Sequence, residues 1–242
     1  METIVTEIEH LNKSFGNNHV LKDINLKIEK GENLVVFGKS GSGKSVLIKC
    51  LVGLIQPDEG KVVLFGKTVS DLEDDELNIL RKKVGFLFQS AALYDSMTVR
   101  ENLEFPLRDL KAKSKEETET LVIEVLKSVG LEDAIDKMPS ELSGGMRKRV
   151  GLARTLILKP ELILYDEPTT GLDPITSKEI SKLILDVQSK HQAASIIITH
   201  DVECARITSN RMIIIKDGVC FATGTFKELS ESKDEWVRSF FI

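Results

Sequence analysis

The chain contains 242 residues, of which 41% are hydrophobic and 29% are charged, a balance typical of proteins that fold around a core. Its net charge of −5 argues against a broad basic surface for nucleic acid. The apolar runs are far shorter than the roughly 18 residues of a membrane-spanning helix, the N-terminal residues lack the pattern of a secretory signal, and the three cysteines form no CxxC pair. These features predict a cytosolic protein.

The predicted elements alternate between strands and helices along most of the chain. Three predicted helices follow a capping residue, at Ser114, Ser143 and Asp173, and apolar residues recur after each cap at helical spacing. Because several of the strands are continuously apolar, they are expected to be covered on both faces, which predicts an α/β fold with a mostly parallel sheet. The predicted strands are 21–28, 34–37, 61–65, 84–88, 162–165, 195–199 and 211–216.

The organisation predicted from this pattern is a single domain. Its core is expected to consist of about residues 1–89 and 160–242. The intervening segment, about residues 90–159, is rich in predicted helix and is interpreted as an insertion into the core.

A glycine-rich loop follows strand 34–37 and precedes a predicted helix, which is the setting in which the pattern GxxxxGK[ST] binds phosphate. Glycines let several backbone N–H groups point at one anion, and the helix N-terminus adds positive potential. Lys44 is expected to bind the β- and γ-phosphates of a nucleotide, and Ser45 to ligate Mg²⁺. The loop consists of Gly38, Lys39, Ser40, Gly41, Ser42, Gly43, Lys44 and Ser45.

Two adjacent acids, Asp166 and Glu167, follow strand 162–165. Because side chains alternate along a strand, the two are expected to point in different directions and to do different tasks. Asp166 suits Mg²⁺, through a water molecule, and Glu167 suits a general base that polarises the attacking water. His200 follows strand 195–199, so it is expected at the same edge of the sheet, where it would donate to the γ-phosphate and orient Glu167 or the water.

A second glycine-rich helix start begins at Ser143, which is a plausible cap, and Gly144 and Gly145 leave the first amides uncovered. The sequence therefore predicts a second anion site at a helix end. The basic residues at the start of this helix, Arg147, Lys148 and Arg149, run against the helix dipole, and we expect them to be solvated or paired with acids elsewhere.

In chain order these features resemble the nucleotide-binding subunits of ATP-binding cassette (ABC) transporters, over almost the whole chain. The resemblance implies a P-loop NTPase fold of the ABC ATPase type, with an antiparallel β subdomain from the N-terminal third and a helical subdomain carrying Ser143. It also implies ATP hydrolysis with Mg²⁺. By the same resemblance, Phe15 stacks on adenine, Gln89 acts in catalysis and in Mg²⁺ binding as the glutamine loop, Asp173 belongs to the nucleotide-binding aspartate loop, and His200 is the switch histidine.

The resemblance further implies a head-to-tail homodimer, in which ATP on the phosphate loop of one subunit is capped by Ser143, Gly144 and Gly145 of the other. It places a contact with integral-membrane permease subunits near Gln89 to Pro106, at the cytoplasmic face of the inner membrane, where the chain would be peripheral. Lipid-binding and regulatory subunits are possible further partners, and nucleic acid is not expected.

One departure from the family pattern is Met146, where many members have glutamine; a thioether cannot replace the hydrogen bonds of an amide. Together with residues 93–99 and the aromatic tail 236–241, it resembles the branch that moves phospholipid between bacterial membranes, namely the Mla and mammalian-cell-entry-linked systems. The tail has a second interpretation, which is an apolar C-terminal helix docked on its own domain.

Three other functions remain open at this stage. The same ATPase would serve an importer of a polar nutrient such as an amino acid, because the cargo is bound by other polypeptides. A soluble ABC ATPase acting on DNA or ribosomes is less favoured, since the chain shows neither a long coiled-coil insertion nor a tandem cassette. A small-molecule phosphotransferase would need the phosphate loop but not the segment 142–146.

Overall fold

The computed structural model describes residues 4–108 and 114–241, and these form two sheets. In the larger sheet, neighbouring strands are parallel except for the antiparallel pair β9–β10. This confirms the mostly parallel α/β core predicted from the sequence. The strand order is β10 (Val219–Gly224), β9 (Arg211–Lys216), β3 (Asn33–Phe37), β8 (Ala194–Ile198), β7 (Leu162–Asp166) and β6 (Val84–Leu87).

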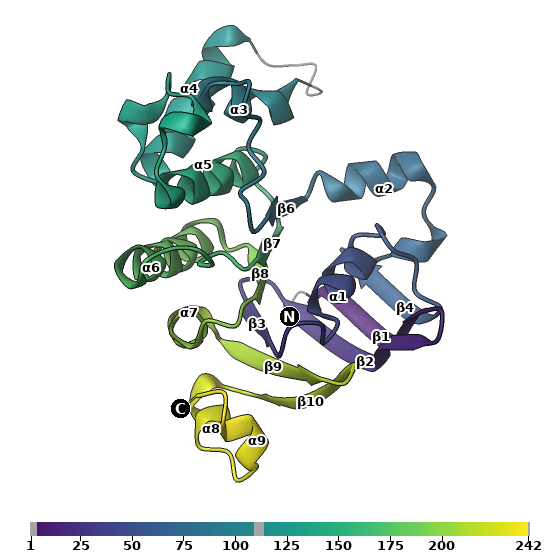
Figure 1. The fold of residues 1–242 in the computed structure, drawn as a ribbon. Coiled ribbons are helices and arrows are strands. Elements are labelled where there is room, and N and C mark those ends of the chain that lie inside the picture. Colours follow the sequence, from purple (N-terminus) through teal and green to yellow (C-terminus); the bar gives the residue numbers. More distant parts are fainter. Residues whose placement is uncertain (1–3, 109–113, 242) are drawn as a thin grey trace.

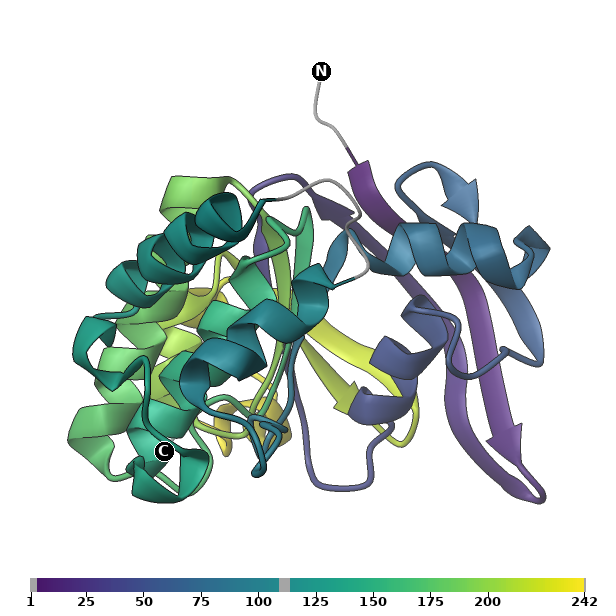
Figure 2. The ribbon, with the colours of Figure 1, turned by 90° about the horizontal axis from the view of Figure 1, so that it is seen from above.

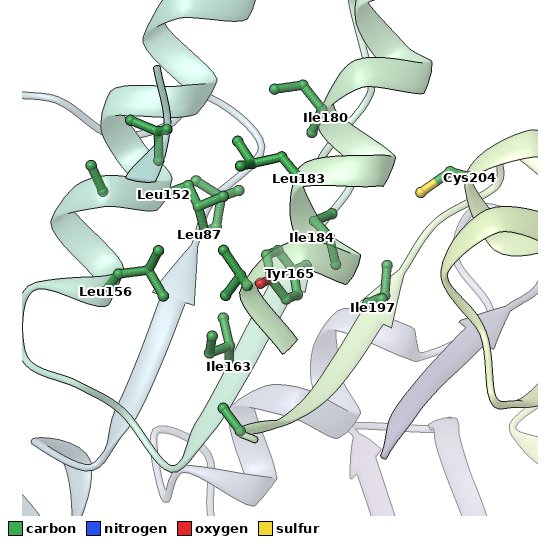
Figure 3. Packing of buried hydrophobic residues seen from close by; sticks show 14 of the residues in the cluster. Leu87, Leu152, Leu156, Ile163, Tyr165, Ile180, Leu183, Ile184, Ile197 and Cys204 are labelled. Carbon is green, nitrogen blue, oxygen red and sulfur yellow. The ribbon is translucent and has the colours of Figure 1, made fainter. Parts of the chain in front are cut away.

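Strands β3 and β7 of this sheet are apolar at successive positions because both of their faces are buried. Alternate residues face two separate cores: Leu34 and Val36 of β3 lie in one cluster and Val35 and Phe37 in the other. Figure 3 shows Tyr165 of β7 among aliphatic side chains that include residues of α5 and α6, and its burial raises the pKa of the phenol far above its usual range. The sheet is therefore covered on both faces.

The second sheet is antiparallel and contains β2 (Asn18–Glu29), β1 (Ile4–Phe15), β4 (Glu59–Leu64) and β5 (Lys67–Thr68), in that order. It confirms the antiparallel β part that the resemblance implied. Strand β1 was not predicted, because the register of its pairing with β2 shifts between Ile8 and Leu11 and this interrupts the two-residue periodicity. In Figure 2 these strands (purple and blue) lie on the opposite side of the parallel sheet from most helices.

The helices divide into three groups. Two belong to the N-terminal third, α1 (Lys44–Leu51) and α2 (Asp74–Arg81). Three lie between β6 and β7, namely α3 (Val99–Glu104), α4 (Lys115–Ser128) and α5 (Gly144–Leu156), and Figure 1 shows them gathered at one end of the molecule. The others are α6 (Pro174–His191), α7 (Val202–Thr208), α8 (Phe226–Ser230) and α9 (Glu235–Arg238). Short 3₁₀ helices occur at Val69–Asp71, Phe105–Leu107, Glu132–Ala134 and Pro139–Glu141.

The three predicted helix caps are present. Ser114 accepts from the Glu117 N–H and forms a capping box, Ser143 accepts from Met146, and the Asp173 carboxylate accepts from two N–H groups of the first turn of α6. The division of the chain at about residues 90 and 159 stays a prediction, and residues 1–3, 109–113 and 242 of the predicted ranges lie outside the described part.

The C-terminal tail docks on its own domain. Trp236, Phe240 and Phe241 pack against the core cluster that contains Phe37, and the ring centroids of Phe37 and Phe240 are 5.5 Å apart. Within residues 4–108 and 114–241, no helix combines the length and apolar character needed to cross a membrane.

Candidate functional site

The largest group of predicted site residues meets at one cavity of about 750 Å³, at the carboxyl ends of β3, β7 and β8. This is where ligands of open α/β sheets bind. The predicted residues that line it are Gly38, Lys39, Ser40, Gly41, Gly43, Lys44, Ser45, Gln89, Asp166, Glu167 and His200. The cavity therefore joins the phosphate loop, the carboxylate pair and the strand-end histidine, which are far apart in the sequence.

The phosphate loop needs its glycines for close backbone approach. At Gly38, where φ is 148°, an added Cβ would lie 2.5 Å from the Ile215 carbonyl oxygen, and at Gly43, where φ is 103°, one would lie 2.8 Å from that of Val20. Helix α1 then begins with no side-chain cap bond from its N-cap, Gly43. Its first N–H groups are thus left for a ligand.

Lys44 is the cation of this loop. Its ammonium donates to the backbone carbonyls of Gly38 at 2.7 Å and Lys39 at 2.9 Å. Burial lowers the pKa of the Lys44 ammonium, and the charges of Glu167 and Asp166 act in the opposite direction. A phosphate group would supply the counter-charge that the two neutral carbonyls lack.

The donor set around Asp166 fits a hard divalent cation. Burial raises the pKa of the Asp166 carboxyl, and the nearby charge of Glu167 raises it further, so a bound cation would favour the ionised form. The Ser45 hydroxyl and the Gln89 amide line the same cavity. Hydroxyl, amide and carboxylate oxygens are the ligands that Mg²⁺ prefers, with phosphate oxygens and water completing its shell.

Glu167 is held in an unusual backbone conformation, with φ at 52°. A non-glycine residue in the left-handed region costs about 1–2 kcal/mol, so its surroundings must fix it. Its N–H donates to the Ile198 carbonyl at 2.9 Å, and its carboxylate accepts from the Thr170 hydroxyl at 3.0 Å and lies 2.8 Å from His200 Nδ1. These contacts hold the Glu167 carboxylate beside His200.

Several predicted residues lie away from this cavity. Ser143, Gly144 and Gly145 at the start of α5 do not line it, and a Cβ on Gly145 would lie 2.5 Å from Thr176 Cγ2, so this glycine permits close packing on α6. Phe15 ends β1, is half exposed and has the Lys13 ammonium 5.4 Å from its ring centroid. Two other predicted residues are outside as well, Ser42 and Asp173.

The expectation that the basic residues at the start of α5 are solvated or paired with acids is wrong for Lys148, whereas Arg147 is exposed and Arg149 pairs with Glu179, as expected. Lys148 donates to the carbonyls of Gln89 and Glu167, and Arg154 donates to those of Ala91 and Ala92. Arg149 combines both kinds of partner, the Val129 carbonyl and the Glu179 carboxylate. These carbonyls belong to irregular segments, and Ala91 and Ala92 themselves have positive φ, so sequence patterns did not reveal them as acceptors.

Sequence reasoning missed part of the cavity wall. The tail supplies two lining residues that were not predicted, Ser239 and Phe240. Four more such residues lie elsewhere in the chain, namely Val20, Phe37, Val46 and Ile198. The aromatic tail was recognised as a feature, but only its packing on Phe37 brings it to the phosphate loop. No pattern in the sequence predicts that contact, because the two residues are far apart in the chain.

A phosphate loop between strand and helix, with a carboxylate pair and a histidine at the next strand ends, defines a P-loop nucleoside triphosphatase. The chain belongs to the ABC transporter family, whose model, described as ABC transporter, matches residues 21–170. It is an ABC-type ATPase, the ATP-binding subunit of a transporter.

Two similar proteins illustrate this membership. "Probable ribonucleotide transport ATP-binding protein mkl" of Mycobacterium leprae is 40% identical over 98% of this chain and 68% of its own length. "Protein TRIGALACTOSYLDIACYLGLYCEROL 3, chloroplastic" of Arabidopsis thaliana is 39% identical over 98% of this chain and 73% of its own. The chain thus spans about two thirds of the mycobacterial relatives.

Among solved structures, the ATP-binding cassette MJ0796, described as dimeric in a post-hydrolysis state bound to ADP and Pi, superposes with a TM-score of 0.82 at 35% identity. The match covers 91% of this chain and 98% of that one. It confirms the ABC ATPase fold predicted from the sequence motifs.

Proposed function

We propose that this chain hydrolyses ATP between two copies of itself and so drives a membrane permease that moves phospholipid. One observation carries the proposal. The cavity gathers the phosphate loop, Asp166, Glu167 and His200, whereas the Ser143 helix start of the same chain lies outside it. A second copy, related by a two-fold axis, would bring the missing helix start to each cavity.

The residues lining the cavity divide the work. Lys44 and the loop amides hold the β- and γ-phosphates, and Ser45, Gln89 and Asp166 hold Mg²⁺. When bound, Mg²⁺ neutralises charge on the phosphate oxygens. The Glu167 carboxylate acts as the general base toward the attacking water, and His200, 2.8 Å from it, orients the carboxylate and donates to the γ-phosphate.

Residues outside the cavity act once the dimer and nucleotide are in place. Ser143, Gly144 and Gly145 of the partner subunit cap the γ-phosphate, and Asp173 lies in the segment that meets the partner. Phe15 stacks on adenine, for which its half-exposed ring is available. Because each ATP then contacts both copies, hydrolysis removes contacts between them and lets the dimer open.

The surface between Gln89 and Pro106 is the proposed contact with the permease. Tyr94 and Phe105 are both partly exposed, 43% and 36%, and their ring centroids are 4.7 Å apart. Phe88, just before this segment, is 43% exposed. Exposed aromatic side chains that lie together are typical of protein interaction sites. This contact would hold the chain at the cytoplasmic face of the inner membrane, with lipid-binding and regulatory subunits as further partners.

The cargo is the finer part of the proposal. A lipid cargo is supported by the plant relative, whose name is that of a galactolipid, and phospholipid in particular by the resemblance carried by Met146 and the tail. The mycobacterial relative is named for ribonucleotide transport and so supports the second candidate, a transporter of a polar solute.

Isolation of the intact complex from its native membrane tests this proposal. Mass spectrometry of the co-purifying proteins and lipids is expected to find an integral-membrane permease with bound phospholipid. A soluble receptor for a polar solute would instead establish the second candidate. Recovery of the chain with DNA or ribosomes and without a permease would contradict both.

A further inference from the structure

Lys148 is a buried cation that the assignments above do not use. Lys148 lies in the first half of α5 and is only 5% exposed. It lines none of the surfaces assigned to nucleotide or permease. Burying an ammonium group costs free energy unless charges and hydrogen-bond acceptors compensate. An apolar side chain would fill the space at less cost, so the contacts of this ammonium require an explanation.

The acceptors of Lys148 are two backbone carbonyls from distant parts of the chain. Its Nζ donates to the Gln89 carbonyl at 2.5 Å and to the Glu167 carbonyl at 3.1 Å. Gln89 begins the segment that we assign to the permease contact, and Glu167 is the proposed general base. One side chain of the helical segment thus touches the backbone of both.

The electrostatic surroundings point the same way. Burial lowers the pKa of the Lys148 ammonium, while the charges of Asp166 and Glu167 oppose this effect. The Glu167 backbone has φ at 52°, a conformation that its neighbours must impose. A cation on the Glu167 carbonyl is one of the contacts that fix it there, alongside the Ile198 carbonyl bonded to its N–H.

We propose that Lys148 is a positioning residue of the ATPase site, whose ammonium joins the carbonyls of Gln89 and Glu167 and so makes the placement of the general base depend on the placement of the glutamine loop. This inference rests on the proposed role of Glu167. A shift of the Gln89 segment, such as one imposed by a docked permease, would move the Lys148 ammonium and so change the position of Glu167. This effect would not require the nucleotide to move.

Helix α5 supports such a link mechanically. Arg154, further along the same helix, donates to the carbonyls of Ala91 and Ala92 at 3.1 and 2.8 Å. Both alanines have positive φ, so α5 grips this irregular segment at two places. Of these two side chains, only Lys148 also bonds to Glu167, the residue that follows β7.

The test substitutes Lys148 in the full-length chain and measures ATPase kinetics with ATP and Mg²⁺. Lys148→Met keeps most of the length of the side chain but removes its charge, and kcat is expected to fall about 10- to 100-fold because two charge-assisted hydrogen bonds are lost. The KM for ATP should change much less, because the side chain does not line the nucleotide cavity. Lys148→Arg, which keeps the charge, should recover most of the rate.

Arg149→Met is the matched control, since it removes a neighbouring cation of α5 that bonds to Val129 and Glu179 and not to the site. It should leave kcat unchanged. If Lys148→Met folds poorly, Lys148→Gln serves instead, with a rate expected between those of the arginine variant and Glu167→Gln. A kcat within about twofold of the parent for Lys148→Met or Lys148→Gln would overturn the inference.

A double-substitution cycle separates this inference from the proposed function. In a Glu167→Gln background, Lys148→Met should lower the residual rate little further, because the group that it positions is already gone. A full additional loss would show a general structural role and contradict the inference. Full activity of Glu167→Gln itself would instead refute the general-base assignment on which the inference rests.

Discussion

Helices α1 and α5 offer a direct comparison within the molecule. Both begin at glycine-rich segments, and each carries a buried lysine, Lys44 or Lys148, whose pKa burial lowers and whose charge the same two carboxylates favour. Lys44 lines the cavity and rests on carbonyls of its own loop, whereas Lys148 bonds to carbonyls of two other segments. Similar burial and charge thus serve different tasks, and the acceptors decide which lysine meets the substrate.

The two helix starts differ in the same sense. Helix α1 has no side-chain cap bond from Gly43, while the Ser143 hydroxyl at the start of α5 accepts from the Met146 N–H at 3.2 Å. The start of α1 lines the cavity together with carboxylates of the same chain, whereas the start of α5 does not line this cavity. A glycine-rich helix start becomes a complete site only where other strand ends surround it.

The largest expected effect sharpens the contrast between catalysis and binding. Glu167→Gln removes the proposed base, so the hydrolysis rate should fall about 100- to 10,000-fold while ATP still binds. Gel filtration with ATP and Mg²⁺ is expected to show an accumulated dimer. A monomer under these conditions would break the idea that the α5 start completes the cavity of another copy.

Lys44→Ala tests the α1 side of the comparison. Loss of charge-assisted hydrogen bonds of about 1.5–3 kcal/mol should weaken ATP affinity about 10- to 150-fold. This can be measured by titration calorimetry, with Arg149→Met as a control that removes a charge elsewhere. Undiminished affinity would mean that the two buried lysines do not differ in task.

Phe15→Ala tests binding at the edge of the site. Loss of base stacking, worth about 1–3 kcal/mol, should raise the KM for ATP about 5- to 150-fold and leave kcat nearly intact, because stacking is similar in ground and transition states. Steady-state kinetics with ATP check this. An effect on kcat alone would place Phe15 outside the adenine contact.

The smallest effect is expected at the α5 start. Met146→Gln should keep the ATPase rate within about threefold, less than 1 kcal/mol, because the Ser143 hydroxyl and the glycine amides keep their place. Complete loss of activity would assign the thioether a specific task, and the two helix starts would then differ in their side chains as well as in their surroundings.

The elements that sequence patterns predicted well are those whose signal is local. The cap of α6 at Asp173, the parallel strands and the loop before α1 all depend on residues close together in the chain. Strand β1 was missed because shifted pairing removed its periodicity, and the contacts of Lys148 were misjudged because its acceptors are backbone atoms of irregular segments.

The sequence alone determined the class of chemistry, since the loop from Gly38 to Ser45, the acids after β7 and His200 must meet wherever parallel strands end at one edge. Only the tertiary structure decided which carbonyls Lys148 bonds to, which backbone conformation Glu167 adopts and that the tail residue Phe240 lines the cavity. The physical reason is that these outcomes depend on contacts between segments that share no local pattern, and a backbone carbonyl looks the same at every position of a sequence.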